Sequence, residues 1–313
     1  DALAMPRRRN SRQATSSGER YPSDAIKNLS GATDIIAGSS VNGRYNFLSY
    51  FLRGSYSFQD KYLFSASVRA DGSSRFGSNN RYGWFPAASV GWVVSEENFL
   101  RNLTFLSFLK LRASYGLTGN AEIGEGAFLA LYGVSNYPGL PGFVPTRLSN
   151  QDLKWERTSQ ADVGLDFGLL DNRITGELDF YNKKTEDLLL AVNIPANTGY
   201  STIVRNLGTM ENKGFEISIN TRNIDNRDFK WNTSFNIGFN KNRVTDIQGQ
   251  IITSGVQRAV EGHPIGSFFL QRFVGADPQT GEAVYLDVDG KETSQYNNGN
   301  RVVAGQANPD FTG

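Results

Sequence analysis

The ten residues from Trp231 to Asn240 alternate between apolar and polar side chains with a period of two. Odd-numbered positions carry Trp, Thr, Phe, Ile and Phe, and even-numbered positions carry Asn, Ser, Asn, Gly and Asn. Because successive side chains of a β-strand point to opposite faces, the segment predicts a strand with one apolar face and one amide-rich face. Such a strand fits a transmembrane barrel, with lipid against one face and water against the other. A half-buried strand of a large soluble antiparallel sheet is the alternative.

The same alternation recurs along the chain. The alternating segments are Tyr45–Phe58, Tyr62–Asp71, Trp84–Val94, Leu109–Leu117, Trp155–Phe167, Ile174–Tyr181, Phe215–Ile219 and Trp231–Asn240, and later Phe268–Val274 and Glu282–Asp287. This predicts about ten strands, many of them close to the 9–11 residues that a strand needs to cross a bilayer. Repetition of long alternating strands favours a membrane barrel over a soluble sheet, whose strands are usually shorter.

The connections between these segments alternate in length. Those at 59–60, 169–172 and 223–228 are short, whereas those at 71–83, 118–152, 185–208 and 244–264 are long and rich in Gly, Asn and Pro. Outer-membrane barrels have short periplasmic turns and long extracellular loops. Because each antiparallel step reverses the chain direction, we expect the short turns to share one rim and the long loops the other.

The predicted fold class is therefore all-β, an antiparallel up-and-down barrel segment over residues 45–313. Residues 1–44 are polar and show no sustained period, so they predict an irregular segment leading into the barrel, with a short helix near Ser23–Leu29. A second short helix is expected around Ser95–Arg101. On the convex side we expect Trp231, Phe235, Ile237, Phe239, Val163, Leu165 and Phe167, and on the concave side Asn232, Asn236, Glu156, Asp162 and Asp166.

Composition excludes several classes of protein. The chain has no run of about 18 apolar residues that would form a transmembrane helix. It has no cysteine, which excludes a disulfide scaffold and a cysteine-based metal site. Its 32 basic and 31 acidic residues leave a net charge of +1, so no global field attracts nucleic acid, which we do not expect as a partner.

Seven segments form a longer pattern that follows one order along the chain. They are SVRADGSSRFG (67–77), RYGWFPAASVGW (81–92), LKLRASYGLTGN (109–120), LKWERT (153–158), LDFYNKKT (178–185), NLGTMENKGFE (206–216) and GADPQTG (275–281). Together these segments resemble the barrel of SusC/RagA-type TonB-dependent transporters of Bacteroidetes. The resemblance covers about residues 45–313 and is more specific than any single motif.

The resemblance implies a plugged outer-membrane barrel of about 22 strands, of which this chain would supply roughly ten, too few to close. It also implies nutrient import, in which an oligosaccharide or oligopeptide binds beneath a SusD-like surface lipoprotein and the TonB complex supplies energy through the plug. The chain shows no signal peptide, plug or final barrel strands, and we therefore expect it to be a fragment. A passive porin or adhesin barrel is the first alternative, and a soluble all-β carbohydrate-binding protein is the second.

Residues that suggest metal or enzyme chemistry have simpler explanations. His263 is the only histidine, and the chain has no second histidine and no cysteine to complete a metal site, so a loop position is expected. The run Asp287-Val-Asp-Gly290 lacks the first acid and the closing Glu of a calcium loop, and an Asp-Gly turn is the preferred interpretation. We predict no catalytic residues, no metal site and no cofactor.

Acidic residues recur on the expected water-filled side. These are Glu156, Asp162, Asp166, Glu177 and Asp179, and basic residues of neighbouring strands are Arg53, Arg69, Lys110 and Arg112. A glycosidase would need two carboxyl groups at a fixed separation in one pocket. Charge pairing inside the barrel, or contact with a plug, explains the acids without catalysis.

Substrate contact is expected in the long loops. The aromatic candidates are Phe128, Tyr132, Tyr137 and Phe143 in 118–152 and Tyr200 in 185–208. Aromatic faces among amides suit sugar rings and peptides alike. Packing of these rings against each other or against the lipoprotein is the alternative. The remaining large rings at Tyr62, Trp84, Phe85 and Trp155 predict an aromatic girdle at the membrane interface.

Overall fold

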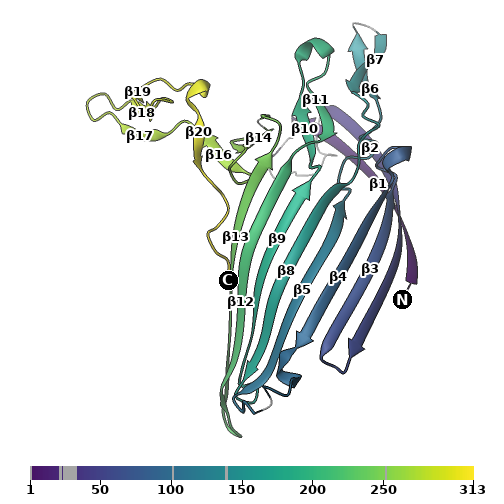
Figure 1. Cartoon of the computed structure of the whole chain (residues 1–313). Coiled ribbons are helices and arrows are strands. Elements are labelled where there is room, and N and C mark those ends of the chain that lie inside the picture. Colours follow the sequence, from purple (N-terminus) through teal and green to yellow (C-terminus); the bar gives the residue numbers. More distant parts are fainter. Residues whose placement is uncertain (1, 21–22, 24–33, 101, 138–139, 251) are drawn as a thin grey trace.

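The structure, a computed structural model, describes residues 2–20, 23, 34–100, 102–137, 140–250 and 252–313. Nine antiparallel strands form one curved sheet in the order β1-β2-β3-β4-β5-β8-β9-β12-β13 (Figure 1). Among the described residues, β1 and β13 do not pair with each other, so the sheet is an open section of wall. The predicted antiparallel, unclosed all-β fold is confirmed.

The strands of the wall are long. Their bounds are β1 Ala2–Glu19, β2 Asp34–Phe58, β3 Tyr62–Ser73, β4 Tyr82–Val93, β5 Leu106–Asn120, β8 Glu156–Leu169, β9 Ile174–Glu186, β12 Thr209–Asp225 and β13 Lys230–Asp246. The shortest has 12 residues and the longest 25. Each therefore exceeds the 9–11 residues that a tilted strand needs to cross a bilayer.

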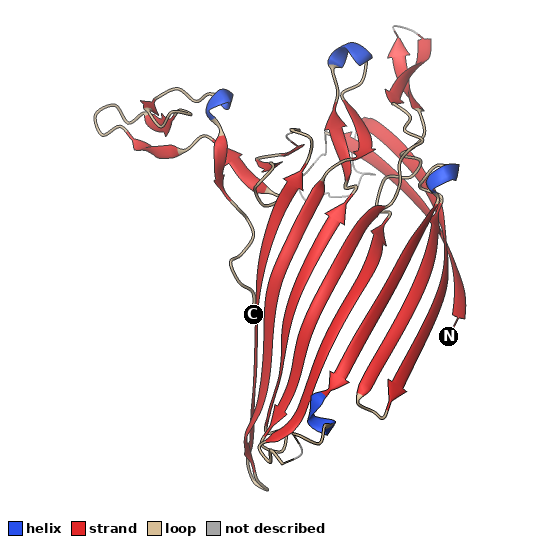
Figure 2. Cartoon of the chain, viewed as in Figure 1, coloured by secondary structure: helices blue, strands red, loops and turns tan. Residues whose placement is uncertain are grey.

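Smaller sheets lie outside the wall. They contain β6 Leu131–Tyr137 with β7 Leu140–Arg147; β10 Leu189–Asn193 with β11 Thr202–Asn206; β14 Ile252–Ser254, β15 Gln257–Ala259, β16 Ser267–Leu270 and β20 Val302–Gly305; and β17 Phe273–Ala276, β18 Ala283–Leu286 and β19 Glu292–Thr293. The helical turns in Figure 2 are 3₁₀ turns of three residues, at Ser78–Asn80, Val94–Glu96, Ala196–Thr198 and Asn298–Asn300. In the part of the chain that the structure describes, no helix has the length and apolar character needed to cross a membrane.

The register of the wall separates an apolar face from a polar one. One row that crosses eight strands in register is apolar throughout, and consists of Tyr56, Phe64, Val90, Ala113, Val163, Phe180, Phe215 and Phe239. The adjacent row on the other face is polar over five strands, with Ser55, Ser65, Ser89, Ser114 and Asp162. We call the apolar side the outer face and the polar side the inner face.

Large apolar side chains of the outer face are exposed, as the alternation predicted. Trp231 is 54% exposed, Phe235 52%, Phe239 44% and Val163 58%. Ile237, Leu165 and Phe167 share this face by register but are only half-exposed. A large apolar surface exposed to water would be unstable, whereas lipid would cover it without cost.

The two rims also differ as predicted. Short turns join β2 to β3, β8 to β9 and β12 to β13 at the lower rim in Figure 1, while the β6–β7 and β10–β11 hairpins stand at the upper rim. Gln59 and Asp60 both have positive φ (52° and 55°), which matches the right-handed twist of the strands that they connect. We call these rims the turn rim and the loop rim.

The prediction for residues 1–44 was wrong where the structure describes them. Instead of an irregular segment, Ala2–Glu19 forms β1, and β2 already begins at Asp34. The two strands pair from Ala2 with Leu52 to Glu19 with Asp34. Backbone hydrogen bonds hold this ribbon together, and its side chains need not alternate because they are exposed from Met5 to Ser17. The helix expected near Ser23–Leu29 falls almost wholly outside the described residues.

The prediction for the last two alternating segments was also wrong. Phe268–Val274 and Glu282–Asp287 do not extend the wall, because the strands found there have four residues each and belong to the small sheets. Four residues are too few to cross a bilayer. The turn predicted at Asp277 is confirmed, since the N–H of Gly281 donates to the Asp277 carbonyl at 2.8 Å.

Candidate binding site

An aromatic cluster lies on the inner face next to the loop rim. Trp155 is its centre, with ring centroids 5.3 Å from Phe76, 5.5 Å from Phe85 and 5.8 Å from Phe47. Phe76, Phe85 and Trp155 are at most 6% exposed, as is Leu153 beside them. Phe85 pairs directly with Arg69, which places both side chains on the polar face of the wall.

Gly119 of β5 leaves room for the Phe85 ring of this cluster because it has no side chain. A Cβ atom added to Gly119 of β5 would collide with the ring of Phe85. The Trp155 indole is fixed from the other side, because its Nε1–H donates to the Arg81 carbonyl at 3.2 Å. The glycine and this hydrogen bond together hold Phe85 and Trp155 against the inner face.

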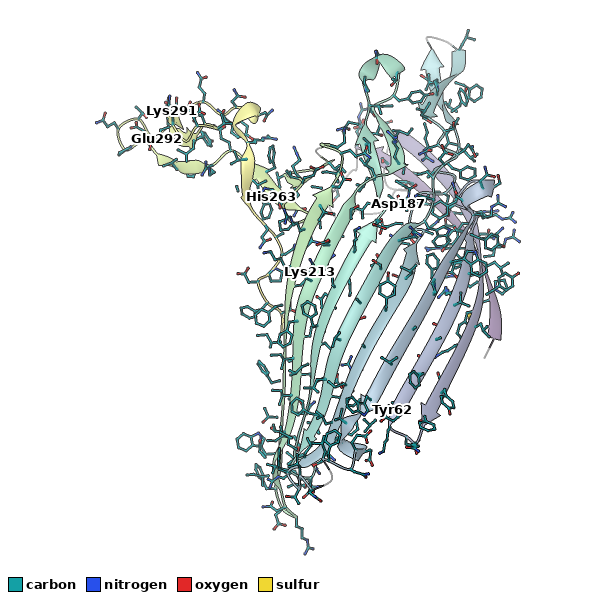
Figure 3. All side chains as sticks on the ribbon, in the orientation of Figure 1. Tyr62, Asp187, Lys213, His263, Lys291 and Glu292 are labelled. Carbon is teal, nitrogen blue, oxygen red and sulfur yellow. The ribbon has the colours of Figure 1, made fainter. Side chains whose placement is uncertain are left out.

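The cluster corrects the predicted aromatic girdle. Phe85 and Trp155 are buried on the inner face rather than facing lipid, whereas Trp84 is 65% exposed. Tyr62 lies near the turn rim (Figure 3), where its ring stacks on Trp92 with centroids 6.5 Å apart. Adjacent strand residues point to opposite faces, so Trp84 and Phe85 cannot both face lipid.

An acidic side chain anchors the aromatic pair at the turn rim. Glu97 follows β4, and its carboxylate accepts from the Tyr62 hydroxyl at 2.7 Å, the Trp92 indole at 3.2 Å and the Lys61 ammonium at 3.2 Å. The hydrogen bond from Tyr62 is the largest of the effects that hold the pKa of Glu97 below its ordinary value. The predicted helix around Ser95 is here a single 3₁₀ turn, Val94–Glu96.

A cavity of about 510 Å³ opens beside the aromatic cluster. Its lining includes Arg7 of β1, Arg69 of β3 and Arg75 from the β3–β4 loop, together with the acids Asp71 and Glu122. Phe47, Phe85 and Trp155 form its apolar part. This volume lies within the ordinary range for small-molecule sites, and the mixture of aromatic and convergent polar groups is typical of them.

Arg75 is the most enclosed cation of the cavity. It is 9% exposed, and its Nη1 donates to the Ala121 carbonyl at 3.0 Å and lies 3.1 Å from the Glu122 carboxylate. Its guanidinium carbon sits 4.1 Å from the ring centroid of Tyr45, a cation–π distance. Arg75 therefore ties the start of the long 121–155 connection to β2.

Arg69 is held by polar neighbours on the inner face. Its Nε lies 2.6 Å from the buried Asp71 carboxylate, and its Nη2 donates to the Ser49 hydroxyl at 3.2 Å. The Arg69 side chain remains half-exposed. It thus contributes a solvated guanidinium to the cavity while neutralising Asp71.

Further toward the turn rim, the predicted charge pairing is confirmed. Asp166 lies 3.2 Å from Lys110 and 2.7 Å from Arg112, and the same Arg112 lies 2.6 Å from Asp179. Asp162 accepts from the Ser114 hydroxyl at 3.0 Å. These carboxylates are bound to cations or hydroxyls of neighbouring strands, so the wall itself accounts for them.

The five aromatic candidates do not converge on one site. Phe128 packs half-buried against the aromatic cluster. Tyr132 and Phe143, 69% and 80% exposed, stand on the β6–β7 hairpin, and Tyr200 is half-buried in the loop that joins β10 to β11. Tyr137 ends β6, but its side chain is outside what the structure describes. A role of these residues in substrate contact stays a prediction.

Of the three arginines of the cavity, the sequence pattern placed only Arg69 on the water-filled side and did not indicate Arg7 or Arg75. Arg7 lies in the segment predicted to be irregular, and Arg75 lies in the long 71–83 connection, outside the alternating strands. The available signal was the SVRADGSSRFG run, in which two arginines flank an Asp-Gly pair. Alternation places Arg69 and Asp71 on one face, but no local pattern brings Arg7 to them.

The remaining chemical candidates are turns and loops. His263 is exposed near the loop rim (Figure 3), and its backbone carbonyl accepts from Val244 at 2.9 Å. The Asp287 carboxylate accepts from the backbone N–H groups of Asp289 and Lys291, which forms the predicted turn. No group of three potential metal ligands occurs among the described residues.

The comparisons with known proteins all point to one family. Residues 8–303 match the family model described as TonB dependent receptor-like, beta-barrel. The chain is 35% identical to TonB-dependent receptor P3 of Formosa agariphila over 92% of its length, and 39% identical to TonB-dependent receptor SusC of Bacteroides thetaiotaomicron over 80%. It superposes along its full length on the RagAB peptide importer in its closed-closed state, with a TM-score of 0.82 and 31% identity.

The chain spans about a third of the length of these relatives. The match covers 32% of receptor P3, 27% of SusC and 36% of the RagAB chain. The similarity therefore concerns a section of barrel wall together with its loops.

Proposed function

The chain belongs to the TonB-dependent receptor β-barrel family, in its SusC/RagA type, and we propose that its sheet is the wall of an importer for oligosaccharides or oligopeptides. The observation that carries this proposal is the division of the wall into an exposed apolar outer face and a polar inner face. Proteins of this family lie in the outer membrane, where lipid contacts the outer face and water the inner face. Cargo would pass along the inner face.

Two partners are part of the proposal. A SusD-like surface lipoprotein would cover the loop rim, and the TonB complex would supply energy through a plug. The solved relative is named as a peptide importer, and SusC is named as a TonB-dependent receptor. Those names support the partners by similarity. Import needs no bond-making chemistry, so we propose that the protein is not an enzyme.

A passive porin or adhesin has the same wall but needs no energy source. Uptake of labelled oligomers by cells that produce the protein, with and without a functional TonB complex, separates the two. We expect uptake and growth on the cargo to require TonB. Uptake that continues at the same rate without TonB would exclude the importer and support the porin. A soluble protein does not fit, because its apolar face would have to be buried.

The orientation of the wall is tested separately. We propose that the loop rim is extracellular, as in other outer-membrane barrels. In the native protein, a Thr198→Cys variant at the β10–β11 tip should react with a membrane-impermeant thiol reagent on intact cells. An Asp171→Cys variant in the β8–β9 turn should be protected until the cells are opened. The reverse pattern would invert the assignment.

A further inference from the structure

The cavity beside the aromatic cluster carries more positive than negative charge. Its lining holds three guanidinium groups, from Arg7, Arg69 and Arg75, and two carboxylates, from Asp71 and Glu122. Each carboxylate is already within 3.1 Å of an arginine, Asp71 of Arg69 and Glu122 of Arg75. Arg7 pairs with no carboxylate among the described residues, so the cavity has one uncompensated positive charge.

From this arrangement we propose that the cavity binds an oxyanion of the cargo, a carboxylate or a sulfate ester. The inference deepens the proposed function, on which it rests, by assigning an acidic group to the oligomer that is imported. Arginine recognises such groups through two parallel N–H donors, and a partly enclosed site strengthens the interaction relative to water.

The ion pair between Arg75 and Glu122 shows where an oxyanion would bind. Arg75 is fixed, because its side chain is only 10% exposed and lies over the Tyr45 ring. Glu122 is 80% exposed, so its carboxylate swings away from the arginine at little cost. A ligand carboxylate would take over the acceptor position that Glu122 now fills.

Arg75 also has an unused donor. Its Nε is buried and has no hydrogen-bond partner in the structure. A buried donor without a partner is unfavourable, so this side chain gains from any acceptor that reaches it.

The rest of the lining accommodates the body of such a ligand. Phe47, Phe85 and Trp155 give an apolar side, and Thr118 and Asn120 add hydroxyl and amide groups next to Glu122. Aromatic surface suits the C–H faces of a sugar ring or an apolar peptide side chain. At about 510 Å³, the cavity has room for a terminal unit of an oligomer rather than for a whole chain.

Binding of defined probes to the native protein tests the proposal. The probes are an oligouronate, a sulfated oligosaccharide, a neutral oligosaccharide of equal length, and one peptide with a free or an amidated carboxyl terminus. We expect at least one acidic probe to bind about tenfold more tightly than its neutral counterpart. The sugar and peptide pairs identify the source of the oxyanion. The advantage should shrink as salt is added.

Matched variants locate the effect in the cavity. Arg7→Gln should remove most of the preference for the acidic probe, and Arg8→Gln should leave it unchanged. Arg8 is the next residue of the same strand, is also exposed and points to the opposite face. Glu122→Gln should tighten binding of the acidic probe several-fold, because the internal competitor loses its charge.

Two results would overturn the inference. One is equal binding of every acidic probe and its neutral counterpart. The other is an equal response of Arg7→Gln and Arg8→Gln. TonB-dependent uptake of the neutral oligomer in the same cells would show that the importer function stands although the oxyanion site does not. Uptake that continues at the same rate without TonB would instead remove the importer itself.

Discussion

Placing a charge at the centre of the outer face gives the sharpest test of the membrane assignment. Ile217 is the ninth of the 17 residues of β12 and pairs with Leu178 of β9 and Ile237 of β13. The substitution Ile217→Arg puts a guanidinium in the middle of this apolar row. Because Ile217 already lies on the outer surface of the wall, the change overpacks no interior.

The cost follows from the depth of the residue. A strand rises about 3.3 Å per residue, and a tilt of about 45° reduces this to about 2.3 Å along the membrane normal. Lys213, the nearest charged position toward the loop rim on the same face, is four residues and therefore about 9 Å away. Arginine near the bilayer midplane of a barrel costs about 2–4 kcal/mol. We expect Ile217→Arg to destabilise the folded barrel by this amount.

Ser218→Arg is the matched control. Ser218 is the next residue, at the same depth but on the inner face, where it pairs directly with Glu177 and lies in a cleft with Asp179 and Glu216. A guanidinium there is solvated and gains carboxylate neighbours, so its cost should be within about 0.5 kcal/mol of zero.

The assay is equilibrium unfolding of the native protein from lipid vesicles by guanidinium chloride, with the midpoint compared at unchanged slope. A lower midpoint for Ile217→Arg and an unchanged one for Ser218→Arg would support the assignment. Equal midpoints, or a larger loss for Ser218→Arg, would refute the division of the wall into a lipid face and a water face.

Three further predictions follow from single contacts. Gly119→Ala should destabilise the native protein by about 1–3 kcal/mol in the same unfolding assay, because the added methyl group collides with Phe85, whereas Gly54→Ala, with open space around it, should cost less than about 1 kcal/mol. The pKa of Glu261 is held below its ordinary value, first by the backbone N–H of Gly249 and then by that of Ile247. The stabilisation that this carboxylate gives the loop is therefore present at neutral pH and is lost as the pH falls below about 4. Hydrogen exchange corrected for pH should show that these two amides lose protection there, and an unchanged protection factor would contradict this. Tyr132→Ala should weaken cargo binding by about 1 kcal/mol if the ring is a stacking platform, and an unchanged titration would remove it from the site.

The wall could be predicted from the sequence because its information is local. Period-two alternation around Trp231 and Val163 reports both the strand and the face, and the short turns at Gln59 and Leu170 fix the connections. Lipid on one side and water on the other impose the same pattern on every strand. One strand therefore predicts the next.

The first strand could not be predicted in this way. β1 is mostly polar and is exposed from Met5 to Ser17, so its conformation depends on pairing with β2, in which Ala2 meets Leu52, 50 residues later in the chain. The β6–β7 hairpin was not predicted for a related reason, since its Gly- and Pro-rich sequence has no alternation of apolar and polar residues. Strand pairing between such segments is a tertiary effect that local propensity does not encode.

The site shows a different limit. Trp84 and Phe85 are neighbours of similar character, and alternation requires one to face inward without saying which. The structure decides through Gly119, which gives the Phe85 ring its space on the inner face. The cavity then depends on Arg7, Arg75 and Glu122, which come from three distant segments. Residue types alone do not predict such convergence.

Exposure now separates the aromatic candidates that composition treated alike. Phe128 is half-buried against the aromatic cluster and thus supports the loop from within. Tyr132 and Phe143 stand on the β6–β7 hairpin, whose one charged residue is Arg147 at the end of β7, and an isolated two-stranded hairpin is marginally stable in water. Because these two rings are so exposed, covering them with cargo or with a lipoprotein partner would remove the most apolar surface from water. The exposed hairpin therefore has the stronger physical case for intermolecular contact, and Phe128 the stronger case for a structural role.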